Sequence, residues 1–129
     1  MVVALMAGCA GLPQIGLSND SPKAAKEQAV AARADAYWKA LIAGDYEAAY
    51  AFLSPASRES IPFARFKGLM ESAGVVRRAA KVEKVECEVA VCKAATSVTF
   101  DHALMKGIVT ANEETWIIDS GQAWLVRKL

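Results

Sequence analysis

Two of the three cysteines are spaced so that they can form a disulfide bond. Cys87 and Cys92 lie in the segment VECEVAVCKAA, where alternating apolar residues predict two strands joined by a tight turn around Val89 and Ala90. A two-residue turn places the cysteines opposite each other as a non-hydrogen-bonded pair, whose close approach suits a disulfide. We expect this disulfide, with two free buried thiols as the alternative. Because no second cysteine pair or nearby histidines complete a ligand set, we expect no metal site.

Few residues are of a type that could transfer a proton. His102 is the single histidine, and Asp101 beside it is the carboxylate that could orient it. Adjacent strand residues point to opposite faces, so we expect His102 to be a surface residue at a strand end. Asp45 stands where a helix needs a cap, and Arg58 is expected in a solvated loop, with closure of a pocket mouth or anion binding as its alternative. No base accompanies the nearby hydroxyl groups, which argues against nucleophilic hydrolysis: Ser54, Ser57 and Ser60.

The chain begins with an uncharged apolar run that ends at a cysteine. Residues 1–8, MVVALMAG, finish with the small residues Ala7 and Gly8 directly before Cys9. Small residues suit a peptidase cleft, and the thiol that follows can carry a lipid. The segment resembles the lipobox of bacterial lipoproteins, with Met6 where leucine is usual and no Lys or Arg ahead of the run. The alternative is an apolar strand or helix; a membrane span would need about 20 apolar residues.

The resemblance implies how the protein is placed in the cell. Residues 1–8 are then a signal peptide, truncated if the true start codon lies upstream, and Cys9 is the lipidated residue. Residues 9–21 are rich in Gly, Pro, Ser and Asn, which predicts a flexible tether. We expect a lipid-anchored protein of the cell envelope whose domain stands in the periplasm or at the cell surface. In an organism with an outer membrane, Ala10 after the cysteine is compatible with sorting to that membrane.

Helix signals dominate the first half of the remaining chain. Ser21 and Pro22 predict the N-cap and first residue of a long helix that Gly44 ends. Asp45 then caps a second helix, which stops before Pro55, and a third helix begins a few residues later. Each repeats apolar residues at three- and four-residue spacing, which is typical of a helix with one face on a core.

Strand signals take over at Gly74, where Val, Thr, Ile and Trp become common. If the loop 119–121 has three residues, Trp116 faces Trp124 across the last hairpin. Helices followed by a strand meander predict an α+β domain over residues 22–129, in which three N-terminal helices pack on a curved antiparallel sheet of about four strands. The expected strands lie near residues 75–88, 91–101, 108–118 and 122–128.

Two phrases carry a resemblance to a known superfamily. AYWKALIAGDYEAAYAFLSP and ETWIIDSGQAWLVRKL resemble the nuclear transport factor 2-like superfamily, a cone-shaped α+β fold that includes ketosteroid isomerase and SnoaL-like proteins. The likeness covers about residues 22–129 and implies a pocket between the helices and the sheet. Five aromatic residues are candidates for the lining of this pocket: Tyr37, Trp38, Tyr50, Phe66 and Trp116. The alternative is that these side chains simply fill the core.

Composition narrows the functions to be considered. Fifteen Lys and Arg residues against fourteen Asp and Glu leave a net charge of +1, and the one basic cluster, Arg77, Arg78 and Lys81, is expected to be a solvated strand start, so we exclude nucleic acid. Because this fold serves both enzymes and noncatalytic domains, it does not fix the function. We expect a membrane-anchored, noncatalytic binding or accessory lipoprotein without a cofactor.

Its expected partner is a small apolar ligand or an envelope protein, and a homodimer through the open sheet face is a weaker expectation. The alternative function is a SnoaL-like or isomerase-like enzyme that acts on a small apolar ligand in the pocket. In that case His102 or Asp45 would transfer the proton.

Overall fold

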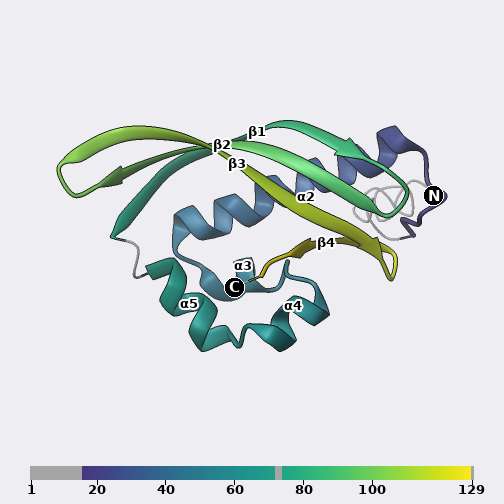
Figure 1. Ribbon diagram of the computed structural model, residues 1–129, viewed down its shortest axis with the longest axis horizontal. Helices are drawn as coiled ribbons and strands as arrows, with labels where there is room; N and C mark the ends of the chain where they lie inside the picture. Colours follow the sequence, from purple (N-terminus) through teal and green to yellow (C-terminus); the bar gives the residue numbers. More distant parts are fainter. Residues whose placement is uncertain (1–15, 72–73, 129) are drawn as a thin grey trace, which may run out of the picture.

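The computed structural model describes residues 16–71 and 74–128, and in these ranges helices precede one antiparallel sheet of order β1-β2-β3-β4. The prediction of an α+β domain with four antiparallel strands is confirmed. In Figure 1 strands β1 to β3 lie above the long helix α2, while β4 and the short helices α3, α4 and α5 lie below it. The elements are α2 (Lys23–Ala43), α3 (Tyr46–Tyr50), α4 (Pro55–Ser60), α5 (Phe63–Glu71), β1 (Val75–Cys87), β2 (Val91–His102), β3 (Met105–Asp119) and β4 (Gln122–Val126).

The prediction of three helices is wrong, because the described ranges contain four. The segment SPASRES is itself helical: the Ser54 hydroxyl oxygen accepts a hydrogen bond from the backbone N–H of Ser57 at 3.2 Å, and Pro55 opens the first turn of α4. A Ser-Pro pair therefore begins a helix where we expected one only to end.

The start of α2 also differs from the expectation. Pro22, not Ser21, is the N-cap, and no side chain caps this end. The Ser21 hydroxyl oxygen instead accepts a hydrogen bond from the backbone N–H of Ser18 at 2.9 Å. Gly44 ends α2 as expected, with φ at 77°, a left-handed conformation that glycine adopts without a Cβ clash.

Two irregularities in β1 keep two of its charged side chains, Lys81 and Glu83, on the exposed face. The register with β2 shifts between Arg77 and Ala79 and again between Val82 and Lys84. Each extra residue reverses the alternation of side chains, so that Lys81 and Glu83 remain exposed on a strand that packs against α2. The β1 residues in the same rows as the buried face of β2 are Val75, Arg77, Ala80, Val82, Val85 and Cys87.

One end of the sheet is closely packed. A row of buried residues crosses all four strands there, with 0–5% of each residue exposed: Cys87, Cys92, Trp116 and Leu125. The expected disulfide joins Cys87 and Cys92. Helix α2 is fixed to this hairpin because the Lys26 Nζ donates to the Val89 carbonyl at 2.7 Å and the Glu27 carboxylate accepts from the Cys87 N–H at 3.1 Å. We call this region the closed end.

The last hairpin differs by one residue from the expectation. Asp119 pairs with Gln122, so the loop has two residues, and Trp116 faces Leu125 while Ile117 faces Trp124. Ser120 and Gly121 both have positive φ, 51° and 84°, as the twist of a two-residue hairpin turn requires. A one-residue change in the loop thus places Trp124 on the opposite face of the sheet from Trp116.

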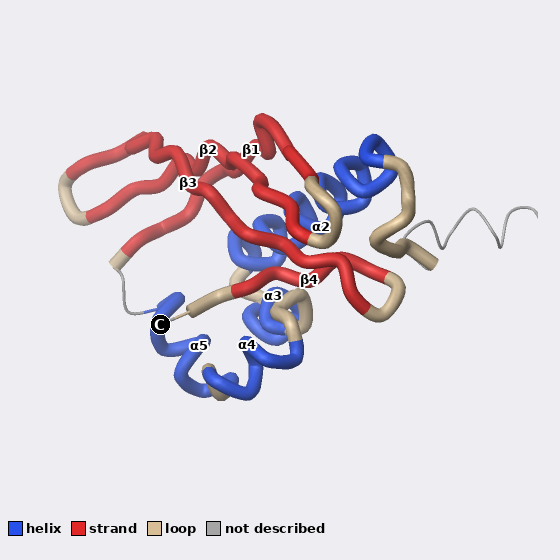
Figure 2. The backbone as a smooth tube through the Cα atoms, turned by 45° about the vertical axis from the view of Figure 1, so that its right-hand side comes forward, coloured by secondary structure: helices blue, strands red, loops and turns tan. Residues whose placement is uncertain are grey.

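The other end of the sheet is open. Strand β4 pairs only with residues 115–119 of β3, so the rest of β3 has no fourth strand beside it. Figures 1 and 2 show the β2–β3 hairpin extending past the helices on this side. The outer edge of β4 is covered, because Leu125 exchanges backbone hydrogen bonds of 2.8 Å with Phe52 and Ser54.

The first described residues pack against the domain at the closed end. The N–H of Leu17 donates to the carbonyl of Gly121 at 3.1 Å, and Leu17 is 9% exposed. The expected signal peptide, Cys9 and the tether up to residue 15 lie outside the described residues. No helix in the described ranges is long and apolar enough to cross a membrane.

Candidate functional site

A pocket of about 240 Å³ lies between α2 and the open end of the sheet, and we call it the α2–sheet pocket. Helices α2 and α5, strands β1 to β3 and the chain just after β4 all contribute to it. Its lining combines apolar and aromatic side chains with a few polar groups, which is typical of small-molecule sites. The lining residues are Tyr37, Trp38, Leu41, Met70, Val75, Arg77, Val98, Phe100, Thr110, Asn112 and Arg127.

Local sequence patterns bring these side chains together. Tyr37 and Leu41 are four residues apart and so share a face of α2. Thr110 and Asn112 lie two residues apart on β3, opposite Val98 and Thr96 of β2. Because β4 stops at Val126, no described strand pairs with the other side of this part of β3, and space remains beside it.

Arg127 lies at the edge of this space. It continues the alternation of Ala123 and Leu125, which are buried, so its side chain is expected on the same face. Its backbone N–H donates to the Ser57 hydroxyl oxygen at 3.0 Å, which ties the chain to α4. The half-buried Arg127 side chain is thereby held at the wall of the pocket.

The Tyr37 hydroxyl is the most unusual polar group in the lining. The residue is 1% exposed, and its hydroxyl, which lies near the Arg127 guanidinium, makes no hydrogen bond of regular geometry among the described atoms. Burial raises the pKa of Tyr37, an effect that the nearby Arg127 charge opposes. Leaving a buried hydroxyl without a partner costs about 1–3 kcal/mol.

A single carboxylate stands close to the pocket. Glu114 accepts a hydrogen bond from the Trp38 indole N–H at 2.8 Å and from the Thr96 hydroxyl at 3.4 Å. Burial raises the pKa of Glu114, and these two hydrogen bonds oppose the rise. The carboxylate thus fixes the orientation of Trp38, which lines the pocket.

The five aromatic residues predicted to line a pocket lie in three different places. Tyr37 and Trp38 line the α2–sheet pocket. Trp116, 0% exposed, packs edge-on against Tyr37 with ring centroids 6.5 Å apart in the closed core. Tyr50 and Phe66 form a separate cluster with ring centroids 5.3 Å apart, where the Tyr50 hydroxyl lies 2.7 Å from the Ile61 carbonyl oxygen.

The structure keeps Asp101 and His102 apart, as the strand geometry predicts. The Asp101 carboxylate accepts hydrogen bonds from Arg78 at 2.8 Å and from the Gly107 N–H at 2.8 Å. The hydrogen bond from Gly107, and to a smaller extent the one from Arg78, holds the pKa of the Asp101 carboxyl below its usual value. His102 is exposed, and its ring lies beside Gly74. The carboxylate therefore serves the hairpin and does not orient the imidazole.

The other polar candidates have structural partners. The Asp45 carboxylate accepts from the Ala48 N–H at 3.2 Å and caps α3. Ser54 donates to Ser57 inside the α4 cap at 2.9 Å. Arg58 lies in helix α4, not in the solvated loop that we expected, with its guanidinium 5.6 Å from the centre of the Trp124 ring.

In the described ranges, no three His, Cys, Asp or Glu side chains are grouped so that they could hold a metal ion. The two described cysteines are joined to each other, and a disulfide sulfur is not a thiolate ligand.

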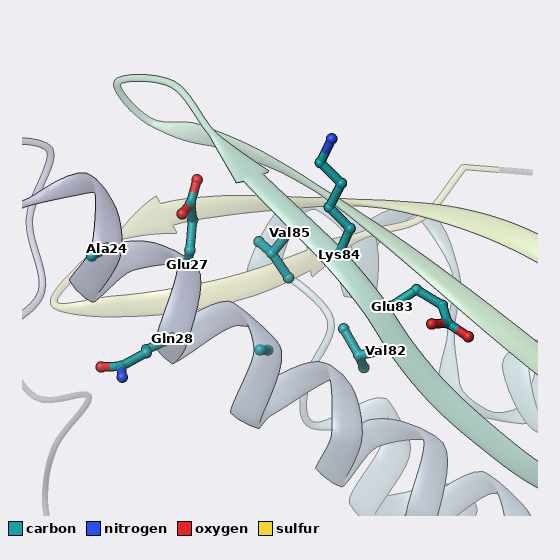
Figure 3. A pocket seen from close by; sticks show the side chains of 8 residues that line it. Ala24, Glu27, Gln28, Val82, Glu83, Lys84 and Val85 are labelled. Carbon is teal, nitrogen blue, oxygen red and sulfur yellow. The ribbon is translucent and has the colours of Figure 1, made fainter.

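A second, shallower hollow runs along the outside of β1, and we call it the edge groove. It has a volume of about 370 Å³ and is lined by Ala24, Glu27, Gln28, Ala31, Val82, Glu83, Lys84 and Val85. Figure 3 shows Val82 and Val85 between β1 and α2, while the Lys84 side chain extends away from the groove. Glu27 is already bonded to the Cys87 N–H. The edge groove is open, and its charged side chains either face solvent or are already bonded to other groups of the protein. The α2–sheet pocket is therefore the better candidate site.

The two arginines of this pocket were not predicted from the sequence. Arg77 was expected in a solvated basic cluster, because the alternation of side chains in a regular strand does not reveal the bulge after it. Arg127 was not considered, although its spacing from Ala123 and Leu125 was a usable signal. Thr110 and Asn112 carried no signal, since their exposure to the pocket depends on where β4 ends.

The comparisons with known proteins bear on the fold. No family model and no curated protein matches the chain. Among solved structures, a SEC-C motif containing protein from Rhodopseudomonas palustris matches with a TM-score of 0.59 and 10% sequence identity. The match covers 70% of this chain and 69% of that chain. At this identity the likeness shows the fold alone.

This finding corrects the family predicted from the sequence. We expected a lipoprotein domain of the nuclear transport factor 2-like superfamily, but the structural likeness is to a SEC-C motif containing protein, and no family model supports the prediction. The phrases on which it rested describe a helix turn at Gly44 and a closing hairpin with Trp116. Such elements recur in many α+β domains, so they indicate an architecture and not a family.

Proposed function

We propose that the chain is a noncatalytic binding module of the cell envelope, which holds a small ligand in the α2–sheet pocket and is anchored to a membrane by a lipid on Cys9. The observation that carries the binding proposal is the pocket of about 240 Å³ itself, which α2, α5 and the sheet line together. A space of this size between packed elements is large enough for a small molecule.

The lining supports binding in a second way. Trp38, Leu41 and Phe100 offer apolar surface, while Asn112 and the two arginines offer hydrogen-bond donors. The candidate proton-transfer groups do not line the pocket: Asp45 caps a helix, Asp101 holds Arg78 and Gly107, and His102 is exposed at a strand end. The pocket thus has the means to hold a ligand, and these three groups lie outside its lining.

A pocket-filling variant tests the binding proposal. Thr110→Trp places an indole in the α2–sheet pocket from β3, and Thr99→Trp is its matched control because Thr99 lies on β2 one position out of phase with Val98. We expect native mass spectrometry to find a small molecule on the wild-type protein and on Thr99→Trp, but not on Thr110→Trp. A wild-type protein that retains no molecule and takes up none from an extract of the same cells would contradict the proposal.

The anchor needs a separate test, because Cys9 lies outside the described residues. We expect mass spectrometry of protein from native membranes to find a mature chain that begins at a lipid-modified Cys9. Cys9→Ser should remain unprocessed and unlipidated, with the Cys87–Cys92 disulfide unchanged as an internal control for export. A native chain that keeps residues 1–8 and carries no lipid would overturn the anchor and leave the binding proposal in place.

A further inference from the structure

Two guanidinium groups line the α2–sheet pocket, and they come from opposite ends of the sheet domain in sequence, β1 and the segment after β4. The Arg77 guanidinium is held in place, since its Nη1 donates to the Met70 carbonyl at 3.3 Å in the last turn of α5. A guanidinium has five N–H donors, so this contact leaves others for a ligand. Arg77 is therefore oriented without being fully used.

Arg127 also keeps donors for a ligand. Its guanidinium lies near the Tyr37 hydroxyl, and within the described ranges no carboxylate lies within ion-pair distance of it. The residue is half-buried. A partly desolvated cation is costly unless an anion or several acceptors approach it, so an anionic ligand in the pocket would offset that cost.

The charge close to the pocket sums to a positive value. Arg77 and Arg127 each carry a positive charge, and the Glu114 carboxylate is close enough to influence Tyr37 and to be influenced by Arg127. Even with Glu114 ionised, two positive groups face one negative group. Glu114 is moreover occupied by the Trp38 and Thr96 donors. One negative charge on a ligand would balance the site.

We propose that the α2–sheet pocket binds a small organic carboxylate, with its negative group between Arg77 and Arg127 and its apolar body against Trp38, Leu41 and Phe100. This inference rests on the proposed binding function and gives that function a ligand class. Charge-assisted hydrogen bonds from a guanidinium suit a planar carboxylate, which can accept two at once. The volume of about 240 Å³ is below the roughly 300–1,000 Å³ of pockets for drug-sized ligands, so the ligand is small.

Three probes of nearly equal shape but different charge test whether the pocket prefers an anion: phenylacetate, 2-phenylethanol and 2-phenylethylamine. Each is titrated into the full chain, with pocket resonances followed by NMR and affinity measured by calorimetry. We expect phenylacetate to bind at least about tenfold more tightly than the alcohol, and the amine to bind most weakly, because the site repels a cation.

Arginine variants locate the charge that matters. Arg77→Gln and Arg127→Gln should each weaken phenylacetate binding by about tenfold or more and leave the affinity for 2-phenylethanol nearly unchanged. Arg127→Lys, which keeps the charge and most of the packing, should retain part of the preference for the acid. Arg65→Gln is the matched control, since Arg65 is an exposed arginine on α5 outside the pocket lining.

The possible results fall into three groups. A preference for phenylacetate that either pocket Arg→Gln variant removes, and Arg65→Gln does not, supports the proposal. Equal binding of acid and alcohol, tighter binding of the amine, or unchanged phenylacetate affinity in both pocket variants overturns the carboxylate inference and leaves the pocket as a binding site. If none of the three probes shifts a pocket resonance, the inference fails, and a native molecule lost in Thr110→Trp would show that the proposed function stands without it.

Discussion

At one end of the sheet a row of buried residues crosses four strands, and at the other a row of half-buried residues crosses three: Arg77, Phe100 and Ile108. The closed end has a disulfide, the Trp116 ring and contacts from Lys26 and Glu27 of α2. The open end has arginines, aromatic side chains and unfilled space. Because β4 is present only at the closed end, the length of one short strand determines which half of the sheet is core and which half leaves room for a pocket.

Truncation of one large side chain at each end tests most directly whether only the closed end is packed as core. Trp116→Ala empties a fully buried position, so we expect a loss of about 3–5 kcal/mol in the free energy of unfolding. Phe100→Ala acts at a half-buried position beside the pocket, and we expect about 1 kcal/mol. Urea unfolding of the two variants measures both values. Similar losses at the two ends would show that the open end is packed as core.

Removal of the disulfide should have the next largest effect. The bond closes a loop between residues only five apart, so chain entropy predicts a contribution of about 2 kcal/mol. We expect Cys87→Ala combined with Cys92→Ala to lower the free energy of unfolding by that amount, and reductant to do the same to the wild-type protein.

The double variant itself provides the control, because reductant should have no effect on it. A loss well below about 1 kcal/mol would show that the α2 contacts alone hold the turn, since the ammonium of Lys26 and the carboxylate of Glu27 already join α2 to this hairpin.

Much of the closed end follows from the sequence, because its signals are local. The spacing of Cys87 and Cys92 and the short turn between them predict the disulfide, and Gly44 predicts the end of α2. The open end depends on features that a single strand does not reveal. The bulge after Arg77 reverses the side-chain alternation of β1, and only the register with β2 shows it.

The helical region shows the same limit on prediction. Ser54 and Pro55 satisfy the rules for ending one helix and for beginning the next, and the sequence does not separate the two. The pocket is also invisible to sequence patterns, because it exists where β4 is absent. Arg127 is the exception, since its alternation with Ala123 and Leu125 could have been read in advance.

A smaller effect of opposite sign is expected at the Tyr37 hydroxyl. Tyr37→Phe removes a buried group that makes no hydrogen bond of regular geometry in the described structure, so we expect the ligand-free protein to become more stable by about 1 kcal/mol. A destabilised Tyr37→Phe protein would show that the hydroxyl has a partner in solution.

The smallest effects are those of pH, and they should differ in sign between Glu114 and Asp101. The pKa of Glu114 is raised above 4.5 by burial, so the native state binds more protons than the unfolded chain just above that pH. Its contribution to stability therefore falls as the pH rises through the raised pKa. The pKa of Asp101 is lowered below 3.8, so its contribution is present above that pH and is lost as the pH falls through the lowered pKa.

Single variants isolate the two trends. Glu114→Gln should remove the loss of stability on the alkaline side of pH 4.5, and Asp101→Asn should remove the loss on the acidic side of pH 3.8. Urea unfolding at a series of pH values measures both, with wild-type protein as the reference. Identical pH profiles for the two variants would contradict the assignment of these slopes.

The contact between Leu17 and Gly121 has a geometrical consequence for a lipid-anchored molecule. Eight peptide units separate Cys9 from Leu17, and a fully extended chain of that length reaches at most about 28 Å. If Cys9 carries the proposed lipid, this length keeps the β3–β4 turn toward the bilayer. The β2–β3 hairpin lies at the far side of the domain, so the pocket lined by Arg77 and Arg127, at the open end of the sheet, is then presented to solutes away from the lipid surface.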